Sequence, residues 1–160
     1  MEQMSQTSDL DLVAVTEAMA GMLQAGGTLG EAWGTTEAER EALYQVGYSL
    51  YGQGKYSEAF KVFSLLVIQN HLEPRYLFAL GGACQMLERY TDALQHYMAA
   101  TVALLDDPLP VFHVAECLIA MGRPEEAKES LELVLLLCKE SHGAVQSRAT
   151  ALLQGLQARQ

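Results

Sequence analysis

The amino-acid sequence predicts an all-α protein, a superhelix of three helix-turn-helix repeats, because several positions recur every 34 residues. Small residues recur at two of these positions, namely Gly47, Gly81 and Ala115 at one and Ala59, Ala93 and Ala127 at the other. Bulky residues recur at a third position, namely Phe63, Tyr97 and Leu131, and prolines at a fourth, Pro74 and Pro108. So many positions in one register are typical of a helical solenoid, in which each unit stacks on its neighbours.

The 34-residue period is that of the tetratricopeptide repeat, a pair of antiparallel helices called A and B. In the first repeat we expect helix A at about residues 37–53 and helix B at about 57–70. The helices of the second repeat are expected within 74–105, and those of the third within 108–139. The corresponding repeat boundaries are 36–72, 73–106 and 107–141.

The turns inside the repeats carry signals of their own. Gly54 and Gly122 can adopt the left-handed conformation that ends a helix A. Ser57 and Thr91 are expected to cap helix B of the first and second repeats. Pro124 suits the first turn of helix B in the third repeat.

A helical extension is expected before the repeats, within residues 1–35. It carries an apolar stripe at helical spacing, formed by Leu12, Val15, Met19 and Met22 on a helix that begins at Ser8 and ends at Gly26 and Gly27. The pattern alone allows this stripe either to fold back on the repeats or to pair with a second chain. Thr36 and Glu39 then form a capping box at the start of the first repeat.

A capping helix is expected after the repeats, within residues 142–160. The last repeat of a solenoid would otherwise expose an apolar face to water. Apolar residues recur at helical spacing in this segment, namely Val145, Ala149, Leu152 and Leu156. We therefore expect this helix to cover the third repeat.

The composition is that of an acidic folded protein. Half of the 160 residues are hydrophobic, and the net charge is −10. Nucleic acid and anionic membranes need a cationic surface, so both are poor partners for this chain. Three cysteines without a CxxC motif, no visible signal peptide and no apolar run long enough to span a bilayer lead us to expect a cytoplasmic location with reduced thiols.

A peptide-binding groove is expected on the concave face, which the A helices line. The residues placed there are Tyr44, Tyr48 and Tyr51 from the first repeat, Phe78 and Gln85 from the second, and Phe112, Glu116 and Ile119 from the third. The tyrosines could simply be core residues, but Leu43, Val46, Gly47 and Leu50 already fill the expected core positions of that helix. An aromatic trough suits an extended peptide with apolar anchors, because aromatic walls offer large contact area with few rotors to immobilise.

Catalytic chemistry is not expected. His113, Glu116 and Cys117 lie close in sequence, but a simple hydrogen bond explains the first two, and Cys117 is expected in the core. No metal-binding, nucleophile or phosphate-binding motif is present, so we expect no metal and no cofactor.

Three segments resemble a particular family of tetratricopeptide proteins. They are QAGGTL at 24–29, the tyrosine-rich LYQVGYSLYGQGKYSEA at 43–59, and FHVAECL at 112–118. Together they are similar to the class II chaperones of bacterial type III secretion systems, and the likeness extends over about residues 10–137.

The resemblance implies a chaperone of the cytoplasm of a Gram-negative bacterium. Family members bind the two hydrophobic translocator subunits and keep them soluble until export, with an extended client segment in the concave groove. The resemblance also implies homodimerisation through the N-terminal region, which favours pairing with a second chain for the apolar stripe from Leu12 to Met22. For some family members it implies a transcription activator as a further partner.

Three other interpretations compete with this one. One is a transcription-coupled regulator, but the chain lacks the basic surface that would let it contact DNA itself. A generic tetratricopeptide scaffold that recognises a C-terminal carboxylate would need a clamp of cations and amides, for which only Arg75 is placed. An enzyme would have to be built on His113 and Cys117.

Overall fold

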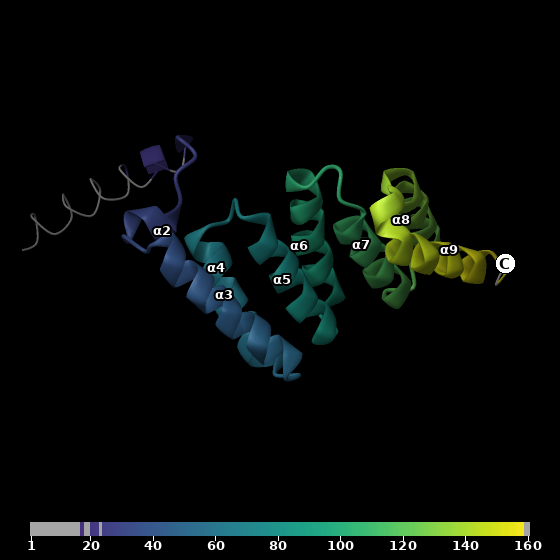
Figure 1. Ribbon diagram of the computed structural model, residues 1–160, viewed down its shortest axis with the longest axis horizontal. Coiled ribbons are helices and arrows are strands. Elements are labelled where there is room, and N and C mark those ends of the chain that lie inside the picture. Colours follow the sequence, from purple (N-terminus) through teal and green to yellow (C-terminus); the bar gives the residue numbers. More distant parts are fainter. Residues whose placement is uncertain (1–16, 18–19, 23, 159–160) are drawn as a thin grey trace, which may run out of the picture.

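The computed structural model describes residue 17 and the ranges 20–22 and 24–158 (Figure 1). Within these ranges every regular element is a helix, as the repeat period predicts. The helices are α2 (Leu29–Ala32), α3 (Glu37–Gly52), α4 (Tyr56–Gln69), α5 (Pro74–Met86), α6 (Tyr90–Ala103), α7 (Pro108–Ala120), α8 (Pro124–Leu137), a 3₁₀ turn (Glu140–His142) and α9 (Gly143–Gln157). None of them is both long and apolar enough to cross a bilayer.

The helices form a one-dimensional stack, which Figure 1 shows running from blue α3 to yellow α9. Three antiparallel pairs, α3 with α4, α5 with α6 and α7 with α8, are the three repeats, and each pair packs on the next. Helix α9 packs on α8 and α7 and closes the stack, as expected of the C-terminal cap. Its residue Ala149 is buried against the third repeat, and Val145, Leu152 and Leu156 pack on the same cluster.

The A helices begin at residues that cap them with side-chain oxygens. Thr36 and Glu39 form the expected reciprocal capping box at α3. At α5 and α7 the first helical residue is a proline, and Glu73 and Asp107 accept the N–H of the second helical residue. These caps satisfy N–H groups that a helix leaves without internal partners.

The B helices begin differently, and the expectation that Ser57 and Thr91 cap them is wrong. The helices α4 and α6 start one residue earlier, at Tyr56 and Tyr90. The turn before each is a Schellman motif, in which the N–H of Lys55 bonds to the carbonyl of Leu50 at 2.9 Å. Lys55 therefore closes the turn at the end of helix A and is also the residue just before helix B. The serine and the threonine consequently lie inside the first turn of their helices.

The left-handed residue of this turn is a glycine in the first and third repeats and a glutamate in the second. Gly54 and Gly122 have φ values of 75° and 70°, and Glu88 at the equivalent position has φ 59°. A side chain in this conformation costs about 1 kcal/mol relative to glycine. We therefore expect Glu88→Gly to raise the free energy of unfolding by about 0.5–1 kcal/mol, measured by urea denaturation followed by circular dichroism.

The matched control is Glu132→Gly, the same substitution at an exposed position inside α8. There glycine should lower the free energy of unfolding by about 1 kcal/mol, because it loses more conformational freedom on entering a helix. Equal signs for the two variants would contradict this account of the turn.

The repeated glycines hold the two helices of a repeat close together, as the sequence indicates. A Cβ atom on Gly47 would lie 2.5 Å from the ring of Phe63, and one on Gly81 would lie 2.9 Å from the ring of Tyr97. Both rings are almost fully buried. Phe63 and Tyr97 therefore each lie directly over a glycine of helix A in the same repeat.

A short helix before the repeats was not expected from the sequence. Helix α2 begins with a second capping box, in which Thr28 and Glu31 exchange hydrogen bonds of 2.8 and 3.3 Å. Its buried Gly30 lies against the end of α4, since a Cβ there would be 3.0 Å from the carbonyl oxygen of Gln69. The T-x-x-E pattern at Thr28 was the available signal.

Three of the four residues in the proposed N-terminal stripe, Leu12, Val15 and Met19, lie outside the described residues. Met22 lies within them and is half-buried, and its carbonyl accepts the N–H of Gly27 at 2.9 Å. Pairing through this stripe stays a prediction.

Candidate peptide-binding groove

The A helices line an open pocket on the concave face, with a volume of about 300 Å³. We call it the aromatic pocket. Six of the eight residues expected in the groove line it, namely Tyr44, Tyr48, Tyr51, Phe78, Gln85 and Glu116. Ile119 lines a depression next to it, and Phe112 lines neither. The spacing i, i+4, i+7 of the three tyrosines on α3 places them on one face, as the sequence indicates.

The walls of the pocket are aromatic rings in contact with one another. The ring of Tyr44 stacks on Tyr48 at 6.4 Å between centroids and lies 5.9 Å from Phe63. On the other side, Phe78 meets the ring of Tyr97 at 5.4 Å, tilted by 59°. Such pairs at 4.5–7 Å stabilise one another by about 0.5–1.5 kcal/mol beyond their burial. The pocket is thus a rigid apolar surface that exists before any ligand binds.

Tyr48 is the most accessible of these rings. Its side chain is 64% exposed, whereas Tyr44 and Tyr51 are half-buried. Contiguous exposed apolar surface marks binding sites, and the ring of Tyr48 extends the apolar lining of the pocket. Tyr48 is therefore the ring with the most surface to lose on binding a ligand.

A hydrogen-bonded network forms the polar end of the pocket. The Tyr97 hydroxyl donates to Gln85 Oε1 at 2.8 Å, and Gln85 Nε2 donates to Glu116 Oε2 at 3.2 Å. His113 Nδ1 lies 2.8 Å from the same carboxylate oxygen, and its ring stacks on that of Tyr97 at 5.1 Å. The expected hydrogen bond between His113 and Glu116 is thus present.

The electrostatics of this network keep it stable near neutral pH. Burial by itself would raise the pKa of the Glu116 carboxyl, but hydrogen bonds from His113 and Gln85 and the charge of Arg148 together lower it. Glu116 is therefore an anion. Burial raises the pKa of the Tyr97 phenol, so its hydroxyl remains a hydrogen-bond donor.

Arg75 does not provide a free carboxylate clamp. Its guanidinium pairs with Glu41 at 3.3 Å and with Glu73 at 3.2 Å, and it lies 5.4 Å from the centre of the Tyr44 ring. These contacts hold the A helices of the first two repeats together beside the pocket. An incoming peptide carboxylate would have to compete with two resident carboxylates, which disfavours the generic scaffold interpretation.

The placement of Phe112 in the groove is wrong, although it shares the repeat position of Tyr44 and Phe78. Its side chain is fully buried, and the guanidinium of Arg148 lies over its ring at 4.6 Å. Helix α9 covers this position in the third repeat.

A second correction concerns Val46 of α3. It was expected in the core, but its side chain is 51% exposed.

Five residues that line the pocket were not expected there from the sequence: Phe63, Ala79, Met86, Tyr97 and His113. Phe63 and Tyr97 were expected only as bulky residues that recur with the repeat. Their rings lie beside the pocket because Gly47 and Gly81 have no side chain that would occupy this space. The signal was a glycine followed by an aromatic residue 16 positions later in the first two repeats. The third repeat has alanine and leucine there, and Leu131 does not line the pocket.

Cys117 has the environment of a core residue. It is fully buried, and burial raises the pKa of its thiol to about 12, with smaller contributions from Glu116 and Cys84. A nucleophilic cysteine needs a lowered pKa, so that the thiolate forms near neutral pH. The environment of Cys117 is the opposite of what catalysis requires.

This environment predicts the reactivity of the three thiols. Cys84 is also fully buried, with its pKa raised to about 11 by burial, whereas Cys138 is half-buried. At pH 8 we expect Ellman's reagent to modify Cys138 within minutes, and Cys84 and Cys117 only after denaturation in urea. Rapid reaction of a Cys138→Ser variant in the native state would contradict this.

Comparison with known proteins agrees with the repeat pattern. A tetratricopeptide repeat family model matches residues 41–69 and 74–103, and a second matches residues 111–141. The chain is 30% identical over 141 residues to the low calcium response locus protein H of Yersinia pestis, with 87% of this chain and 84% of that protein covered. It is also 30% identical over 120 residues to the chaperone protein SicA of Salmonella typhimurium, with 75% and 73% covered.

Solved structures of related proteins have the same fold. A T3SS complex from Aeromonas hydrophila is similar with a TM-score of 0.85 and 31% identity, covering 89% of this chain and 97% of that one. PcrH of Pseudomonas aeruginosa, in complex with the chaperone binding region of PopD, has a TM-score of 0.75 and 32% identity, covering 78% and 95%. The Yersinia enterocolitica type III secretion translocator chaperone SycD, in an alternative dimer, has a TM-score of 0.74 and 29% identity, covering 78% and 96%.

Proposed function

This chain belongs to the tetratricopeptide-repeat chaperones of type III secretion translocators, and we propose that it keeps its own hydrophobic translocators soluble and ready for export. It binds each of them through an extended segment that lies in the concave groove. The aromatic pocket is the observation that supports this proposal most strongly. Its exposed Tyr48 and the neighbouring rings offer apolar surface to a client in a geometry that is already formed.

The physical task fits such a groove. Membrane-active segments exposed to water are unfavourable by about 25 cal/mol per Å² of apolar surface, so they aggregate or insert into bilayers. A chaperone that covers an anchor segment favours the soluble state through binding alone. No covalent step is needed, and the raised pKa of the Cys117 thiol argues against one. We therefore propose a non-enzymatic role in the bacterial cytoplasm, without a cofactor.

The test is co-expression with each translocator of the same secretion system. We expect the translocator to be in the soluble fraction and to co-purify with the chain, and to be insoluble when expressed alone. Because the pocket walls are apolar, the complex should survive 0.5 M NaCl, since salt screens charge contacts and not apolar ones. Translocators that remain insoluble with the chain present would overturn the proposal.

We also propose that residues 1–35 form a dimerisation region, with Leu12, Val15, Met19 and Met22 at the interface. The helical spacing of the apolar residues supports this, as does the dimer formed by SycD. Deletion of residues 1–27 is expected to halve the mass in sedimentation velocity and to leave the helical content of the repeats unchanged. A full-length chain and a truncated chain that sediment in the same oligomeric state would contradict it.

A further inference from the structure

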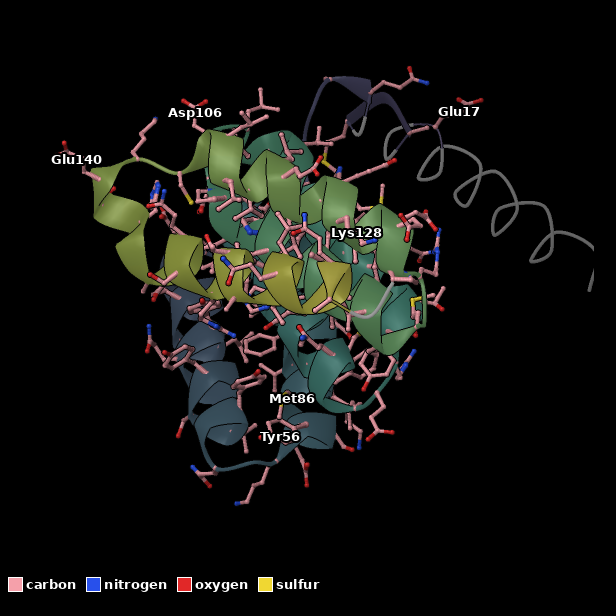
Figure 2. The ribbon with its side chains drawn as sticks, turned by 90° about the vertical axis from the view of Figure 1, so that its right-hand side faces the viewer. Glu17, Tyr56, Met86, Asp106, Lys128 and Glu140 are labelled. Carbon is pink, nitrogen blue, oxygen red and sulfur yellow. The ribbon has the colours of Figure 1, made fainter. Side chains whose placement is uncertain are left out.

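The concave face continues beyond the aromatic pocket into a second depression, with a volume of about 420 Å³. The two hollows share Gln85, Met86 and Glu116, so they are parts of one continuous surface. The second one is completed by Ile119 of α7 and by Leu152 of α9. Seen from the C-terminal end, Figure 2 shows α9 lying across the front of the array, with Met86 labelled below it.

Helix α9 is also tied to the groove by a charged contact. Arg148 donates to Glu116 Oε1 at 2.8 Å, while His113 and Gln85 contact the other carboxylate oxygen. A helix that only capped the last repeat would need its apolar face, which Ala149 and its neighbours already provide. Arg148 instead reaches the concave side, and Leu152, at the edge of the capping cluster, also lines the second depression.

We infer that α9 forms a second subsite for the client, which takes a second apolar side chain of the same extended segment. This inference rests on the proposed function. The first anchor occupies the aromatic pocket, the segment crosses the bridge between Gln85 and Glu116, and the second anchor lies between Met86, Ile119 and Leu152. Continuity of the two hollows supports one ligand for both.

The charges around the second subsite define the chemistry of this anchor. The carboxylates of Glu88 and Glu116 border the depression, so an acidic side chain is disfavoured there. Covering an unpaired carboxylate with an apolar segment would be costly, because the ion would lose its water without gaining a partner. His113 and Gln85 are the partners of one oxygen of Glu116, and Arg148 is the partner of the other, Oε1. Arg148 is therefore a positioning residue that lets a neutral apolar segment lie over Glu116.

The subsite is tested by placing a charge in it. The probe is a fluorescein-labelled chaperone-binding segment of a translocator from the same secretion system, and its affinity is measured by fluorescence anisotropy. We expect Leu152→Glu to weaken binding at least tenfold. The control Gln154→Glu adds the same charge to the exposed side of the same helix and should change the affinity less than twofold.

The remaining variants separate the possible outcomes. If Leu152→Glu loses helical content, Ile119→Glu on α7 tests the same subsite from the other wall, with the same expected loss of affinity. A folded Leu152→Glu protein that binds like wild type, while Tyr48→Ala binds more weakly, overturns the second subsite and leaves the proposed function intact. A wild-type chain that does not bind the segment overturns both.

Arg148 is tested by a conservative pair of substitutions. Arg148→Gln removes the charge and should weaken binding of the same segment about three- to tenfold, since charge-assisted hydrogen bonds are stronger than neutral ones. Arg148→Lys keeps the charge and should recover most of the affinity, even though lysine cannot stack on Phe112 as arginine does. Equal weakening by both substitutions would show that Arg148 acts only by packing.

Discussion

The double replacement Tyr44→Ala, Tyr48→Ala is expected to weaken translocator binding about 100-fold while the helices remain folded. Truncation of a central aromatic residue in an interface commonly costs 1–2 kcal/mol or more, and each 1.4 kcal/mol is a tenfold change in affinity. Both rings form the wall of the aromatic pocket. Isothermal titration calorimetry with the translocator segment measures the effect directly.

The control for this experiment is Val102→Ala. Val102 is 75% exposed, more than Tyr48, and lies on helix α6 away from the residues that line the pocket. We expect this variant to bind like wild type, because loss of exposed apolar surface elsewhere should not matter. The single variant Tyr48→Ala separates binding from stability, since Tyr44 also packs on Phe63 and Tyr76 and its loss destabilises the first repeat. Unchanged affinity in the double variant would contradict the groove assignment.

Substitution of Gly47 by alanine is expected to lower the free energy of unfolding by about 1–3 kcal/mol. The added Cβ would lie 2.5 Å from Phe63 Cε1, and this ring is 1% exposed and cannot move into solvent. Forcing an extra carbon into a packed interface displaces side chains and backbone at about this cost. Urea denaturation followed by circular dichroism measures the loss.

Gly52→Ala provides a control on the same helix. Nothing lies within 4 Å of the position that its Cβ would take, so only the higher helix propensity of alanine remains. This variant should be more stable than wild type by up to about 1 kcal/mol. If Gly47→Ala were stabilising too, the glycines would not be maintaining the close approach of helices A and B.

Most of the fold could be predicted from the 34-residue period, because packing in a solenoid repeats with the sequence. It located the three helix pairs, the left-handed turns at Gly54 and Gly122, and the close contacts at Gly47 and Gly81. The period could not predict that Ser57 lies inside α4 instead of capping it. One Schellman turn ends a helix and starts the next, without a separate capping residue. Local propensity rules treat those two ends as independent.

The groove was predictable only where one repeat follows another of the same kind. Tyr44 and Phe78 share a repeat position and both line the aromatic pocket. Phe112 has the same position, but its repeat is followed by α9 instead of another repeat, and α9 has its own sequence and places Arg148 over the ring. A periodic pattern describes what neighbouring repeats do to each other. It cannot describe what a unique terminal helix covers, and the contact of Arg148 with Glu116 was not predicted for this reason.

The most direct test of the account is photo-cross-linking from the pocket to a translocator in living bacteria. A benzoylphenylalanine at position 48 should form a covalent adduct with the co-expressed translocator, and mass spectrometry should place the adduct in one short segment of the client. The same photoreactive residue at position 102, on α6 and away from the pocket, should form none. An adduct from position 102 without one from position 48 would contradict binding in the aromatic pocket.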